Sequence, residues 1–103
     1  MTEILNEINL PWAYHHFAEG ESPDPPFMLY LYPESDNFGA DNKVYAGITM
    51  VYLELYTDEK DLATEEAIES ILESHGIFWD KSETWIESEK LYEVLYSFEM
   101  EVS

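Results

Sequence analysis

The chain of 103 residues contains no cysteine and no arginine, and it has lysine at only four positions. Without cysteine it can form neither disulfide bonds nor thiolate sites, which is consistent with a reducing compartment such as the cytosol. Without arginine it lacks the planar fork that reads base edges, and four lysines are too few for the clusters that grip phosphate backbones. These absences argue against binding to nucleic acids and to anionic membranes.

Long hydrophobic runs are also missing. The longest apolar stretches cover residues 27–32 and 47–53, far short of the roughly 20 residues that cross a bilayer. No basic segment followed by an apolar stretch lies near the first residue. We therefore expect neither a membrane span nor a secretion signal.

Acidic and aromatic residues are abundant. The chain carries 23 Asp and Glu, a formal net charge of −19, 46% hydrophobic residues and 16% aromatic residues. This composition is too apolar for a disordered acidic tail, and the length suits one core, so we expect a single domain over residues 1–103. The acid excess either keeps an aromatic-rich surface soluble or gives the domain a field that repels or imitates DNA.

The first half of the chain predicts one short helix and one strand. Apolar spacing favours a helix over residues 2–8, with Thr2 as its N-cap. Residues 11–26 hold four prolines and a glycine and predict an irregular loop with packed aromatic side chains. The run at residues 27–32 favours a buried strand, and the turn-forming residues at 34–43 predict a loop leading to the next strand.

The longest predicted strand covers residues 44–56 and is apolar on both of its faces. A sheet with helices on one side needs only one apolar face, so the second face must be covered by another element or by another chain. Met50 and Tyr52 lie on this second face and are our candidates for a subunit contact. The first face carries Tyr45, Thr49, Val51, Leu53 and Leu55, and the second carries Val44, Ile48, Met50, Tyr52 and Tyr56.

The second half predicts the main helix and two more strands. An apolar stripe follows the capping residues 58–61, and Gly76 after His75 predicts the end of this helix. Residues 78–81 are expected to turn and residues 84–87 to form a short strand. The final strand, residues 92–102, alternates between apolar and polar side chains, with Leu95 as the exception on the polar face. The predicted fold is α+β, with an antiparallel or mixed sheet of about four strands, a main helix and a short N-terminal helix packed on it.

Candidate catalytic and metal-binding residues are few. His15, His16 and His75 do not follow the spacing of a known ligand set, and no carboxylate is singled out by its sequence context. Residues 36–43 are rich in calcium-type ligands but lack the spacing of an EF-hand loop. We therefore predict no enzyme activity, no catalytic residues and no cofactor or metal.

The chain resembles the tail terminator proteins of long-tailed phages and prophages, which are also called head-tail joining or tail completion proteins. The likeness extends over nearly the whole chain and rests on ordinary residues in order, not on a catalytic motif. Those residues are Leu10-Pro11 before Tyr14 and Phe17, Pro25-Pro26 before an apolar strand, Ala40-Asp41-Asn42 before Tyr45, Glu54-Leu55-Tyr56-Thr57 with Lys60-Asp61 after it, Gly76-Ile77 near Trp79, and Tyr92, Tyr96 and Phe98.

The resemblance implies an α+β domain that assembles with copies of itself as a ring, most simply a hexamer. Such a ring caps the tail tube, meets the head connector protein, and is found in the virion tail and, during assembly, in the cytoplasm of the bacterial host. An acidic lumen would let DNA pass without sticking. As a candidate docking loop for the tube or connector protein we take the segment that contains Asp36, Asn37, Phe38 and Asp41.

Two other interpretations remain open at this stage. The chain could be a DNA mimic that inhibits a DNA-binding protein, although mimicry needs acidic rows on one face, whereas here the acids are spread along the chain. It could also be a plain acidic scaffold or adaptor.

Overall fold

The computed structural model describes residues 1–33 and 48–101 and confirms the α+β class. In these two ranges, five strands form one mixed sheet, one more than the approximate four expected, and two helices accompany it. The elements in chain order are α1 (Thr2–Ile8), β1 (Trp12–Tyr14), β2 (Phe27–Leu31), β3 (Ile48–Thr57), α2 (Leu62–Ser74), β4 (Trp79–Ile86) and β5 (Leu91–Glu101).

The sheet has the strand order β1-β2-β3-β5-β4. β1 runs parallel to β2, and every other neighbouring pair is antiparallel. The long strands β3 and β5 pair over ten residues, from Ile48 opposite Glu101 to Thr57 opposite Tyr92. This pair is the centre of the molecule, and the shorter strands extend it on both sides.

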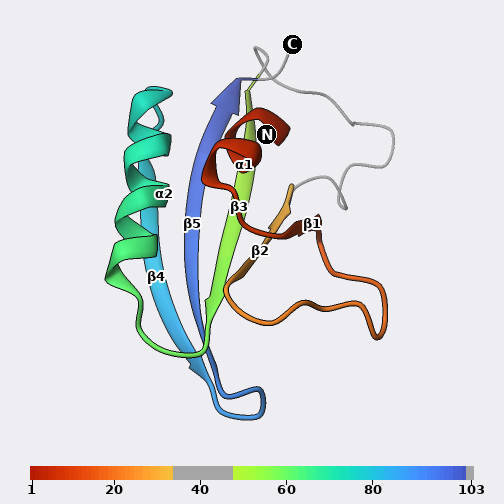
Figure 1. Ribbon diagram of the computed structural model, residues 1–103. Helices are drawn as coiled ribbons and strands as arrows, with labels where there is room; N and C mark the ends of the chain where they lie inside the picture. Colours follow the sequence, from red (N-terminus) through yellow and green to blue (C-terminus); the bar gives the residue numbers. More distant parts are fainter. Residues whose placement is uncertain (34–47, 102–103) are drawn as a thin grey trace.

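Both helices cover the same face of the sheet (Figure 1). Alternate residues of β3 and β5 point toward the helices because side chains alternate across a strand. They form the core together with Ile4 and Leu5 of α1 and with Ile68 and Leu72 of α2. The strand residues in this core are Met28, Val51, Leu53, Leu55, Val94, Tyr96 and Phe98.

The main helix α2 begins and ends where its capping residues predict. The Asp61 side chain accepts a hydrogen bond from the backbone N–H of Thr64 at 3.1 Å. At the other end, Gly76 has a φ of 72°, its N–H donates to the Glu73 carbonyl at 2.9 Å, and the Ile77 N–H donates to the Leu72 carbonyl at 3.0 Å. These two bonds form a Schellman motif, which satisfies carbonyls that the helix itself leaves unpaired.

The N-terminal helix α1 has the predicted bounds, but its predicted cap is wrong. Met1 and not Thr2 occupies the N-cap position, and no side chain caps the helix. The helix ends at Asn9 in a left-handed conformation with φ 64°. Its Glu7 carboxylate lies 2.7 Å from the His75 ring at the end of α2, so a polar contact joins the two helices at their edge.

Two strand predictions need correction. Part of the segment expected to be irregular, residues 11–26, forms strand β1, because the Pro11 carbonyl accepts from the Met28 N–H and the Tyr30 carbonyl accepts from the His15 N–H, each at 2.8 Å. Strand β4 begins at Trp79, where we expected a turn. Its middle residues are polar and exposed, so the apolar pattern that marks a strand is absent.

The candidate docking loop with Asp36, Asn37, Phe38 and Asp41 lies outside the described residues, as do residues 44–47 of the predicted long strand. Within the described ranges, neither helix has the length and apolar character needed to cross a membrane.

Candidate functional site: the open face of the sheet

The face of the sheet opposite α1 and α2 is the candidate interaction site, and we call it the open face. Strand β3 contributes every second residue to it, because the alternate residues Val51, Leu53 and Leu55 lie in the core on the opposite face. Strand pairing places side chains of β2 and β5 beside them. The β3 residues of the open face are Ile48, Met50, Tyr52, Glu54 and Tyr56.

One end of the open face is covered by the segment between β1 and β2. The Phe17 ring meets the Phe27 ring edge-on at 5.4 Å between centroids, and Phe27 stacks on Tyr56 at 5.2 Å. Phe27 is buried as a result. This segment therefore buries the apolar side chains at this end of the open face without help from a second chain.

Two carboxylates share the Tyr56 hydroxyl at the border of this covered end. The hydroxyl lies 3.0 Å from Glu54 Oε1 and 2.9 Å from Glu93 Oε2. A tyrosine has one proton to donate, so it satisfies one carboxylate fully, and the second contact is favourable when the other carboxyl carries a proton. Burial raises the pKa of Glu54, and the negative charge of Glu93 raises it further, whereas the hydrogen bond from Tyr56 partly opposes this shift. Burial and the hydrogen bond to Glu93 raise the pKa of Tyr56, so its hydroxyl stays protonated.

The other end of the open face holds the residues predicted for a subunit contact. Met50 and Tyr52 lie on this face and are half-buried, and Ile48 beside them keeps 44% of its surface exposed. Tyr52 is paired with Leu31 on β2 and with Ser97 on β5. The predicted placement of Met50 and Tyr52 on the second face of the strand is confirmed, and their role in a contact stays a prediction.

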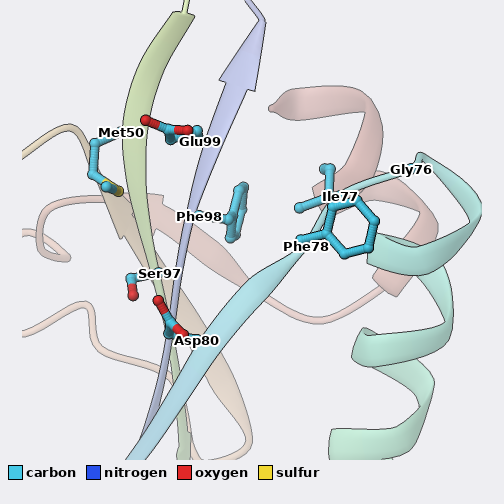
Figure 2. Close-up of a pocket in the computed structure, with 8 residues that line it drawn as sticks. All are labelled: Met50, Gly76, Ile77, Phe78, Asp80, Ser97, Phe98 and Glu99. Atoms are coloured by element: carbon cyan, nitrogen blue, oxygen red, sulfur yellow. The ribbon is translucent and has the colours of Figure 1, made fainter.

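A shallow depression of about 290 Å³ opens near this end, where β4 begins (Figure 2). Apolar side chains of Met50, Ile77 and Phe98 line it together with the carboxylates of Asp80 and Glu99. Its remaining lining residues are Gly76, Phe78 and Ser97. It is open to solvent and combines apolar and acidic surface.

On the helix side, one carboxylate is buried, and the sequence analysis did not single it out. Glu65 of α2 is only 2% exposed, and its two oxygens lie 2.8 Å from the ammonium groups of Lys60 and Lys81. Burial alone would raise the pKa of Glu65, but the two lysines outweigh it and lower the pKa. The available sequence signal was its position, since residues 65, 68 and 72 fall on one helical face and the other two are core residues.

The lysines of the described chain are all engaged by carboxylates. Lys60 pairs with Glu83 as well as Glu65, Lys81 lies 2.6 Å from Glu69, and Lys90 pairs with Glu87. The surface of the described residues therefore presents no lysine without a carboxylate beside it.

The histidines do not come together as one site in the described residues. The rings of His15 and His16 contact each other, with 3.1 Å between their Nδ1 atoms, whereas His75 contacts Glu7. In residues 1–33 and 48–101, no group of three or more His, Asp or Glu is arranged to hold a metal ion.

Comparison with known proteins gives no relative. No family model matches the chain, and no curated protein or solved structure is significantly similar to it.

Proposed function

We propose that this chain is a structural protein of the virion, a tail terminator that assembles with copies of itself into a ring, caps the tail tube and joins the tail to the head connector. The observation that carries the proposal is the open face of the sheet. Its β3 strand places Ile48, Met50 and Tyr52 on a surface that the helices do not cover.

The self-contact is supported by the position of these apolar side chains. A ring needs heterologous contacts, in which one patch of a subunit meets a different patch of the next. Tyrosine and methionine are enriched in such contacts. The exposed surface of Ile48, next to half-buried Met50 and Tyr52, gives each subunit apolar area that a neighbour can bury.

The passage of DNA is supported by the charge. The chain has a formal net charge of −19, and the described lysines are already engaged by carboxylates. Phosphates approaching this surface meet uncompensated negative charge. A channel bordered by such subunits would repel the DNA backbone and so prevent it from adhering.

The alternative, a DNA mimic, has less support. Mimicry requires exposed carboxylates in rows on one face that imitate phosphates. Exposed acidic residues of this chain occur instead on both helices, on the segment between β1 and β2, and on the hairpin between β4 and β5. Two further carboxylates have partners within the chain: Glu54 accepts a hydrogen bond from a tyrosine, and Glu65 pairs with two lysines.

Deleting the chain's gene from the phage or prophage that encodes it tests the proposal. Electron microscopy of the lysate should show filled heads separated from tails, with tails of abnormal length, and supplying the gene from a plasmid should restore joined particles. Normal heads joined to tails of normal length would overturn the assignment. Capture of a DNA-binding enzyme by a purified monomer would favour the mimic.

A further inference from the structure

The depression at the start of β4 adjoins the apolar end of the open face and shares Met50 with it, but it adds two carboxylates and an exposed aromatic ring. We propose that it binds a basic segment of another protein, in which lysine or arginine side chains alternate with apolar ones. We call this surface the Phe78 site, and it consists of Met50, Ile77, Phe78, Asp80, Phe98 and Glu99.

The Phe78 site is marked by an exposed aromatic ring. Phe78 leaves 92% of its surface in contact with solvent, an unusual position for a large apolar side chain that has core positions close by in the sequence. Rigid aromatic side chains are the commonest anchors of protein interfaces. The side chain therefore costs solubility unless a partner covers it.

The backbone around this ring is fixed, so Phe78 is presented by a rigid frame. On one side, the Ile77 N–H donates to the Leu72 carbonyl in the Schellman motif that ends α2. On the other side, Trp79 pairs with Phe98 as the first residue of β4. A ring held between two such anchors loses little backbone freedom when a partner binds, which lowers the entropic cost of association.

The charge of the lining identifies the partner. Asp80 and Glu99 border the depression, and none of the described residues that line it is a lysine. Their charges favour cations and disfavour nucleic acids and other acidic surfaces. Met50 and Ile77 add partly exposed apolar side chains to the lining, on opposite sides of the carboxylates (Figure 2), so the partner must offer apolar side chains as well as cations.

The described residues of a second copy of the chain do not supply this chemistry. That copy brings a net charge of −19, four lysines and no arginine, and Lys60, Lys81 and Lys90 are already paired with carboxylates. Bringing two such surfaces together at acidic side chains is repulsive. The partner at the Phe78 site is therefore a different, basic protein. This inference rests on the site itself and does not require that the chain be a tail terminator.

The test uses the purified chain of residues 1–103 and a blocked heptapeptide of alternating lysine and leucine as the probe. Titration followed by backbone NMR should give saturable binding, with shifts concentrated at Ile77, Phe78, Asp80 and Glu99. A peptide with glutamate in place of lysine should not bind. A peptide with serine in place of leucine should bind about tenfold more weakly, since it lacks the apolar contact.

Variants locate the binding on the chain. Phe78→Ala should weaken binding about tenfold, and because the ring is exposed the variant should fold normally, as amide spectra would verify. The double variant Asp80→Asn/Glu99→Gln should weaken binding several-fold and reduce its salt dependence. Glu87→Gln/Glu89→Gln removes the same charge at the far end of β4 and should leave the affinity unchanged.

Three results would overturn the inference: no saturable binding of the lysine–leucine peptide, equal binding of the lysine–serine peptide, or equal weakening by the control double variant. Either of the last two results would show that the peptide is attracted by the overall negative charge of the chain and not bound at the Phe78 site.

Discussion

Replacing Glu65 by glutamine measures how much the ion pairs of Glu65 with Lys60 and Lys81, which join α2 to β4, contribute to the free energy of unfolding. The carboxylate is 2% exposed, and Lys60 and Lys81 each lie 2.8 Å from it. Breaking a fully buried ion pair costs about 3–5 kcal/mol. Here both lysines are partly exposed and keep a second carboxylate, Glu83 or Glu69, so the expected loss is smaller, about 2 kcal/mol, typical of a hydrogen bond to a charged group. In a domain of this size that corresponds to a fall in Tm of about 8–16 °C.

The pH dependence separates this electrostatic effect from a loss of packing. The pKa of Glu65 is lowered from its ordinary value of 4.5, so the stabilisation is present above that value and is lost as the pH falls through the folded-state pKa. Calorimetric melts of the wild type and Glu65→Gln should therefore differ at about pH 7, and the difference in Tm should shrink as the pH falls below 4.5. Glu66→Gln, an exposed neighbour on the same helix, controls for the change in net charge. Equal Tm values at pH 7, or a difference unchanged in acid, would refute the reasoning.

Two further substitutions test local features. Gly76→Ala places a side chain at φ 72° with no atom within 4 Å of the new Cβ, so its cost in stability should be conformational alone, about 1 kcal/mol. In chemical denaturation Gly76→Asn should lose less stability than Gly76→Ala. An alanine variant as stable as the wild type would contradict the Schellman assignment. Glu54→Gln removes a carboxyl whose pKa is raised, first of all by burial. A carboxyl with a raised pKa in the folded state lowers the free energy of unfolding as the pH rises from its ordinary pKa through the raised pKa. That variant should melt above the wild type at about pH 7 and lose this advantage at about pH 3, and a lower Tm at neutral pH would count against the assignment.

The elements that the sequence predicted best are those specified by neighbouring residues. The bounds of α2 follow from Asp61 at its start and Gly76 at its end, and both act within a few residues of themselves. The alternation along β5 likewise marks its core face, on which Val94, Tyr96 and Phe98 are buried. The two-faced character of β3 predicted that Met50 and Tyr52 lie away from the core.

The features that were missed depend on residues distant in sequence. Strand β1 is three residues long and exists because β2 supplies its hydrogen-bond partners. Strand β4 is an edge strand whose polar middle is tolerated because it is exposed to solvent. The burial of Glu65 needs Lys60 and Lys81, which precede α2 and follow it, so no local pattern reveals their convergence. The Tyr56 contact with Glu93 likewise joins residues 37 positions apart.

The most direct test of a self-contact through the open face is the mass of the purified protein measured by light scattering over a range of concentrations. Ile48→Asp places a charge on the exposed end of β3, and Leu62→Asp places the same charge on α2, at a side chain that is 61% exposed. We expect that the mass of the wild type and of Leu62→Asp rises with concentration toward that of a ring, whereas Ile48→Asp stays a monomer. Equal masses for the wild type and Ile48→Asp at every concentration would contradict this expectation.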